Sequence, residues 1–169
     1  MSEEHYRKLY AAAARLPHAA AVFNVLDKAL VGLVAGIYVF IFFWSFVSQF
    51  PGAPVIVFGP MAAFFFVTIL RRALNFRRPY EVFGTTPLLE KDTERRSFPS
   101  RHVASAFAIA ASLLFWDVRL AALLAVFGVL IAFLRVAGGV HFLRDVIAGA
   151  LIGGGIGFAA VVLFALFRG

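Results

Sequence analysis

The C-terminal stretch from Val146 to Phe167 reads VIAGALIGGGIGFAAVVLFALF and contains no charged residue. It is as long as the roughly 20 apolar residues that a helix needs to cross a bilayer core of about 30 Å. Gly149, Gly153 and Gly157 recur every four residues, so they line one face of such a helix, where a neighbouring helix can approach closely. The stretch therefore predicts a transmembrane helix that packs through a glycine face.

Four further apolar segments precede it, of which the third is short on its own. They are Leu30 to Val47, Val55 to Leu70, Val103 to Phe115 and Leu120 to Leu134. The 169-residue chain is 62% hydrophobic and only 15% charged, whereas soluble domains carry about 25% charged residues. The fold class expected is all-α: a polytopic membrane helix bundle with about five transmembrane helices.

The N-terminal stretch from Glu3 to Asp27 has a different composition, because it mixes alanines with charged residues such as Arg7 and Arg15. We expect an interfacial helix that is interrupted near Pro17. The alternative is a frayed, partly disordered tail. The chain would then divide into an N-terminal interfacial segment, residues 1–28, and a transmembrane domain, residues 29–169.

The net charge is +7 and the sequence contains no cysteine. The basic residues lie between apolar runs, so anionic lipid head groups or a phosphorylated substrate are expected as partners, and nucleic acid is not. The lack of cysteine excludes disulfides, cysteine nucleophiles and thiolate metal sites.

Two connections hold most of the polar chemistry. The stretch from Arg71 to Arg101 is long and rich in arginine, and the stretch from Arg135 to Asp145 is polar and contains Gly138 and Gly139. If five helices span the membrane, both connections lie on the same face. A long loop in a compact protein is usually functional or disordered.

In the second of these connections, Arg135, His141 and Asp145 form a candidate catalytic group. A His and an Asp four residues apart lie on one face of a helix, so Asp145 could accept the Nδ1 proton of His141. That would leave Nε2 free to attack an electrophile. Arg135 is close enough along the chain to bind the anion under attack. The alternative is an interfacial histidine beside a snorkelling aspartate.

The long loop ends in SFPSRH, residues Ser97 to His102. Pro99 is tolerated in the first turn of a helix, so Ser100, Arg101 and His102 are expected in the opening turn of the next apolar segment. Unpaired N–H groups and the positive end of the helix dipole suit phosphate there. Ser100 adds a hydroxyl donor, and His102 could protonate a leaving oxygen. The alternative for Ser100 is an ordinary helix cap, and the alternative for His102 is an interfacial side chain.

At the start of the loop, Arg71 and Arg72 end the second apolar segment, and Arg77 and Arg78 precede Pro79. Arginine binds phosphate in bidentate fashion, although a cationic flank for lipid head groups is an alternative. Phosphoryl transfer needs several cations, a nucleophile, a group that orients it and an acid for the leaving group. The three regions together supply all four roles.

These three stretches resemble the signature of the type 2 phosphatidic acid phosphatase (PAP2) superfamily, which also includes the vanadium haloperoxidases. That signature is a Lys, six residues and Arg-Pro; then Pro-Ser-Gly-His; then Ser-Arg, five residues, His, three residues and Asp. The matching residues here are Arg78, Pro79, Pro99, Ser100, His102, Arg135, His141 and Asp145. Three positions differ: Arg71 stands for the Lys, Arg101 for the Gly and Leu134 for the Ser.

The resemblance implies a role for each matched residue. His141 would form a phosphohistidine, Asp145 would orient it and His102 would protonate the leaving group. The phosphate would be held by Arg71, Arg78, Ser100, Arg101 and Arg135. The family needs no metal, and no cofactor is expected. The function implied is an integral-membrane, metal-independent phosphatase acting on phosphatidate, phosphatidylglycerol phosphate, or a polyprenyl phosphate or diphosphate.

Two other functions remain as alternatives. A lipid phosphotransferase could use the same site, and a non-catalytic membrane protein could bind anionic lipid through the basic loop. A haloperoxidase is disfavoured because such enzymes are soluble. We expect an integral protein of the cell membrane. The arginine-rich loop alone would place the site on the cytoplasmic side, whereas the resemblance implies the extracytoplasmic side, which is the side we expect.

Overall fold

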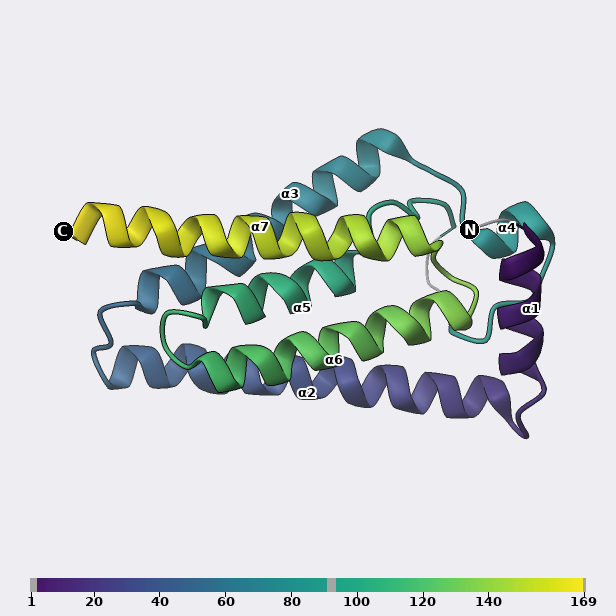
Figure 1. Cartoon of the computed structure of the whole chain (residues 1–169), viewed down its shortest axis with the longest axis horizontal. Helices are drawn as coiled ribbons and strands as arrows, with labels where there is room; N and C mark the ends of the chain where they lie inside the picture. Colours follow the sequence, from purple (N-terminus) through teal and green to yellow (C-terminus); the bar gives the residue numbers. More distant parts are fainter. Residues whose placement is uncertain (1–2, 91–93, 169) are drawn as a thin grey trace.

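The computed structural model describes residues 3–90 and 94–168, and every regular element among them is a helix. The helices are α1 (Glu3–Ala14), α2 (Ala19–Val47), α3 (Ala53–Leu74), α4 (Pro79–Phe83), α5 (Arg101–Ser112), α6 (Val118–Ala137) and α7 (Leu143–Arg168). Five of them, α2, α3, α5, α6 and α7, run up and down along one bundle axis (Figure 1). The expected all-helical membrane bundle is confirmed.

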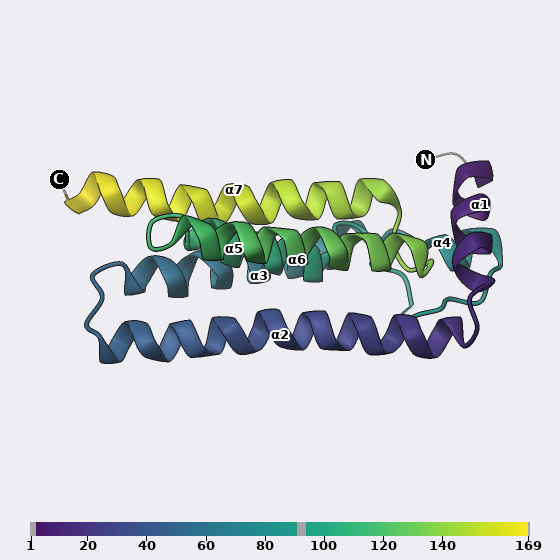
Figure 2. The same ribbon diagram turned by 60° about the horizontal axis from the view of Figure 1, so that its bottom comes forward.

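The two ends of the bundle differ in their connections. At one end short turns join α2 to α3 and α5 to α6, and at the other end lie the α3–α5 connection and the α6–α7 turn (Figure 1). Helix α1 crosses this second end, roughly perpendicular to the bundle axis (Figures 1 and 2). The two polar connections therefore share one end, as the sequence predicts.

Four helices, α2, α3, α6 and α7, are long and apolar enough to cross a membrane. Helix α5 has 12 residues, so it is only about 18 Å long against a bilayer core of about 30 Å. Within residues 3–90 and 94–168, four helices thus meet the length of a full span, and the shorter α5 runs beside them along the same axis. The segment is apolar because it is enclosed by other helices: its buried side chains include Val103, Ala106 and Ile109.

Large apolar side chains cover the outside of the bundle. Phe40 is 65% exposed, Phe133 57% and Leu151 71%, although each lies within a long helix. A soluble monomer rarely exposes contiguous apolar surface on this scale, whereas lipid tails solvate it well. The surface pattern agrees with the membrane position that hydropathy predicts.

The predicted glycine face of α7 is the contact surface for α5. A Cβ atom built on Gly153 would lie 2.0 Å from the backbone oxygen of Ala104, and one on Gly157 would lie 2.5 Å from that of Ala108. Only a residue without a side chain permits backbones to approach this closely. This α5–α7 seam, formed by Gly149, Gly153 and Gly157 against α5, brings together two elements that carry site residues.

The N-terminal region differs from its expected boundaries. The chain does break near Pro17, but α2 begins at Ala19 rather than at Leu30. The extra turns are helical because Ala19, Phe23 and Asp27 are buried against the protein. The domain boundary expected between residues 28 and 29 falls within this continuous helix, and the division into two domains stays a prediction.

Helix α1 is attached to the loop that leads into the site. The ring of Tyr6 packs on Phe83 with centroids 4.8 Å apart. The Tyr6 hydroxyl is 3.0 Å from Thr85 Oγ1, and the side chain is only 1% exposed. The amphipathic N-terminal helix is therefore part of the packed structure at the polar end of the bundle.

Candidate active site

Hydrogen bonds to backbone oxygens join the three candidate regions at the polar end. Ser100 N donates to Asp145 O at 2.8 Å, which links the start of α5 to the start of α7. Arg78 Nη1 donates to Val140 O at 3.1 Å, which links the α3–α4 connection to the α6–α7 turn. Residues up to 67 positions apart in the sequence thus meet in one place.

His141 and Asp145 lie together, but not on one helical face as expected. Helix α7 begins at Leu143, so His141 precedes it and is brought back by the turn after α6. The distance from His141 Nδ1 to Asp145 Oδ2 is 3.5 Å, which is longer than a well-formed hydrogen bond. Both side chains are buried, with 1% and 0% exposure. The nitrogen facing the carboxylate is Nδ1, as the predicted orienting role requires.

Ser97 is a site residue that the sequence reasoning missed. Its hydroxyl donates to Asp145 Oδ2 and lies 3.5 Å from His141 Nδ1. The same carboxylate oxygen accepts the backbone N–H of Phe142 at 2.9 Å. Asp145 is therefore held by two donors besides the imidazole. Ser97 opens the SFPSRH stretch, so its position next to Pro99 and Ser100 was the available signal.

The surroundings of the His141 imidazole favour its neutral form. Burial lowers the pKa of His141 below its ordinary value of 6.5, because a buried imidazolium has lost its hydration. Asp145 opposes this shift, and the positive charges of Arg78 and Arg71 add to it. A neutral imidazole at physiological pH is the form that can act as a nucleophile.

Arg71 and Arg78 are each anchored by backbone carbonyls. Arg71 Nη1 donates to Pro99 O at 3.1 Å, and Arg78 Nε donates to Arg95 O at 2.9 Å. Arg78 is 3% exposed, and no carboxylate hydrogen bonds to its guanidinium among residues 3–90 and 94–168. These are fixed positive charges beside His141, which suits the binding of an anion.

At the start of α5, Ser100 caps the helix without using its side chain. Its Oγ atom is buried and has no hydrogen-bond partner among the described residues. Buried polar atoms are rarely left unpaired, so this hydroxyl is available to a ligand. Pro99 lies before the helix rather than in its first turn, since α5 begins at Arg101.

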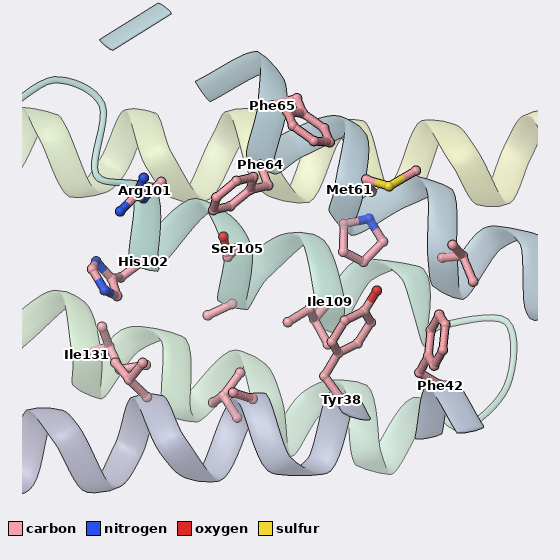
Figure 3. A pocket seen from close by; sticks show the side chains of 16 residues that line it. Tyr38, Phe42, Met61, Phe64, Phe65, Arg101, His102, Ser105, Ile109 and Ile131 are labelled. Atoms are coloured by element: carbon pink, nitrogen blue, oxygen red, sulfur yellow. The ribbon is translucent and has the colours of Figure 1, made fainter. Parts of the chain in front are cut away.

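Arg101 and His102 face a cavity of about 550 Å³ between α2, α3 and α5. Arg101 lies over the ring of Phe64, 5.3 Å from its centroid. Figure 3 shows Arg101 and His102 at one end of the cavity and Phe42 at the other, with apolar side chains between. The two polar residues thus lie at one end of a mainly apolar cavity.

Arg135 is placed differently from the other predicted phosphate ligands. Its Nε and Nη2 atoms donate to the two carboxylate oxygens of Asp27, at 2.8 and 2.7 Å. Asp27 lies at the end of the stretch from Glu3 to Asp27 that the sequence predicts to be interfacial. A lone aspartate just before an apolar run was a signal for a functional or paired residue.

A metal site was not expected. Within the described residues, no three His, Asp or Glu side chains gather closely enough to hold a metal ion. Positive charge at the site comes from arginine, and metal independence stays a prediction.

The fold and this site define a helical membrane protein whose polar end combines histidine, aspartate and several arginines. The chain belongs to the PAP2 superfamily, because the model of that family matches residues 54–168. With its apolar spanning helices, it is an integral-membrane phosphatase of this superfamily. The matched range holds every predicted site residue and excludes Asp27.

The fold is similar to that of a solved structure, LpxE, and a second structure matches with a lower TM-score. LpxE from Aquifex aeolicus is 28% identical with a TM-score of 0.74, over 94% of this chain and 93% of that chain. The first transmembrane PAP2 type phosphatidylglycerolphosphate phosphatase from Bacillus subtilis is 21% identical with a TM-score of 0.46, over 97% and 92%. No curated protein sequence matches the chain.

Proposed function

We propose that this protein removes phosphate from a lipid-linked phosphate or diphosphate through a phosphohistidine on His141. The observation that carries the proposal is a buried His141 beside Asp145 and two anchored arginines, in a fold that also holds an apolar cavity lined at one end by His102. The cavity suits a hydrocarbon chain, and the arginines suit its phosphate. Phosphatidate, phosphatidylglycerol phosphate and polyprenyl phosphates all combine these two parts.

The first step forms a bond between His141 Nε2 and phosphorus and breaks the bond from phosphorus to the ester oxygen. His102 donates a proton to that oxygen as it leaves, which avoids expelling an alkoxide. Asp145 stabilises the positive charge that develops on the imidazole. The guanidinium groups of Arg71 and Arg78 offset the charge on the equatorial oxygens of the transition state.

The second step reverses these roles. A water molecule attacks phosphorus while His102 accepts its proton, and the bond from phosphorus to Nε2 breaks. Inorganic phosphate leaves and His141 returns to its neutral form. Each step transfers one proton and one phosphoryl group, so the cycle needs no metal and no redox partner.

The test is phosphate release by purified protein in detergent, with phosphatidate, phosphatidylglycerol phosphate and prenyl phosphates as substrates and EDTA present. We expect activity that vanadate inhibits, since vanadate mimics the pentavalent transition state, and a phosphoenzyme that is labile to acid. His141→Ala should abolish both, whereas His5→Ala on the exposed face of α1 should not. Full activity of His141→Ala would exclude the mechanism.

We also propose that the protein lies in the cell membrane with this site on the extracytoplasmic side. The chain has no cysteine, so single cysteines report on sidedness directly. A cysteine at Thr86 lies at the site end and one at Ser48 lies at the opposite end, and both positions are exposed. A membrane-impermeant thiol reagent added to intact cells should label the first and not the second; the reverse pattern would overturn the orientation.

A further inference from the structure

The ion pair between Asp27 and Arg135 links a helix outside the family match to a residue inside it. The model of the family begins at residue 54, so Asp27 belongs to a part of the chain that it does not describe. Arg135, in contrast, occupies the arginine position of the third motif. Arg135 is 3% exposed and Asp27 8%, which makes this a buried pair.

The contact is bidentate. Arg135 Nε is 2.8 Å from Asp27 Oδ1, and Nη2 is 2.7 Å from Oδ2. Two parallel hydrogen bonds of this kind define the plane of the guanidinium as well as its position. A guanidinium has five N–H groups, so three remain for another acceptor.

The pair lies at the site end of the apolar cavity. Asp27 is four residues from Val31 on α2, and Arg135 is four residues from Ile131 on α6, so each shares a helical face with a residue that lines the cavity. The positive charges of Arg71 and Arg101 act repulsively on that of Arg135. The pair thus lies one helical turn from the cavity lining and within the electrostatic field of the other arginines.

Burying an ion pair is costly, and apolar replacements often give equal or greater stability. Stability alone therefore does not account for this pair. The location of the ion pair gives a better reason for it. Repulsion from the neighbouring arginines would push the Arg135 side chain away from them unless a carboxylate held it. Asp27 offsets one of these positive charges and prevents Arg135 from adopting other rotamers.

We propose that Asp27 is a positioning residue, which orients the guanidinium of Arg135 so that its remaining N–H groups bind a phosphate oxygen of the substrate. This inference rests on the proposed function and adds a residue that the family motifs do not contain. Asp27 itself does not touch the substrate. A pre-oriented arginine binds an anion more tightly because less side-chain freedom is lost on binding.

The test compares vanadate inhibition and kcat/KM for an aryl phosphate in wild type, Asp27→Asn and Asp27→Glu, in detergent. Asn keeps the shape and loses the charge, and we expect vanadate to bind about 10-fold more weakly and kcat/KM to fall by a similar factor. Glu keeps the charge but displaces the guanidinium, and we expect a smaller loss of at least about threefold.

The matched control is Glu90→Gln. Glu90 pairs with Lys28, the neighbour of Asp27 in the sequence, in an ion pair whose side chains are 69% and 70% exposed. Loss of this exposed ion pair should leave the affinity for vanadate unchanged. A second check uses Arg135→Lys: if Asp27 acts through Arg135, adding Asp27→Asn to Arg135→Lys should weaken vanadate binding no further.

Each result decides the proposal. Unchanged vanadate affinity in folded Asp27→Asn would mean a purely structural pair, and tighter binding would mean that Asp27 competes with phosphate; both overturn it. If Asp27→Asn does not fold, wild-type affinity in Asp27→Glu overturns it. A wild-type protein that releases no phosphate overturns the proposed function itself, whereas an active wild type with unaffected variants overturns only the role of Asp27.

Discussion

The two sides of α5 are built in opposite ways. On the α7 side, Gly149, Gly153 and Gly157 bring two backbones into direct contact. On the side of α2 and α3, side chains leave a cavity of about 550 Å³. The close contact holds the start of α5 against the start of α7, where Ser100 bonds to the backbone of Asp145. The close contact therefore holds the candidate site residues of α5 and α7 together, and the other side of α5 has room for an apolar chain.

The largest expected effect comes from breaking the seam. In Gly153→Ala the new Cβ would lie 2.0 Å from Ala104 O, so α5 and α7 must separate, at a cost of at least about 1–3 kcal/mol. We expect most of the phosphatase activity to be lost and the thermal unfolding midpoint in detergent to fall. Gly155→Ala, where a Cβ meets nothing within 4 Å, is the control. Normal activity and an unchanged midpoint in Gly153→Ala would show that the seam does not align the site.

The second largest effect is expected from filling the cavity on the side of α5 that faces α2 and α3. Ala35 lines the cavity, and Ala35→Trp should reduce kcat/KM for a long-chain lipid phosphate by about 10-fold or more. Hydrolysis of a small aryl phosphate should be preserved, because it does not use the cavity. Val39→Trp, at a position 50% exposed on the same helix, should alter neither. An equal loss with both substrates would argue against a chain-binding role for the cavity.

A smaller effect is expected at the site end of the seam, where Ser97 bonds to Asp145. Ser97→Ala removes one donor from a buried carboxylate, which costs about 1–1.5 kcal/mol and should lower kcat about 10-fold. The matched control is Ser112→Ala at the far end of α5, whose buried hydroxyl has no partner among the described residues. Wild-type kcat in Ser97→Ala would remove Ser97 from the catalytic group.

The smallest effect is a displacement of the pH profile. Burial lowers the pKa of His141 from 6.5, and the neutral imidazole is the reactive form. The activity that depends on neutral His141 is therefore complete above the lowered pKa of His141, and it is lost as the pH falls through that pKa. In the pH profile of kcat/KM, the midpoint of the fall on the acid side should lie below pH 6.5. The profile is measured with an aryl phosphate whose leaving group needs no protonation. A midpoint at or above pH 6.5 would show that His141 is not buried in the working enzyme.

Local patterns in the sequence predicted which polar residues gather at one end of the bundle. Arg78, Ser100, His141 and Asp145 lie at one end of the bundle because each occupies a connection between apolar segments, and alternating helices bring those connections together. Ser97 was missed because its role depends on its distance from Asp145, 48 residues away. Asp27 was missed for the same reason, since its partner is 108 residues away on α6.

By itself the sequence determined the helical membrane fold, the glycine face of the last helix and the three polar motifs, because hydropathy and short spacings act over one or two helical turns. Only the tertiary structure decided that α5 is short and enclosed by other helices, that α2 begins at Ala19, and that Arg135 is bound to Asp27. These features depend on which helices pack against each other. No local pattern contains that information, because contacts between distant segments arise from the packing of the whole bundle.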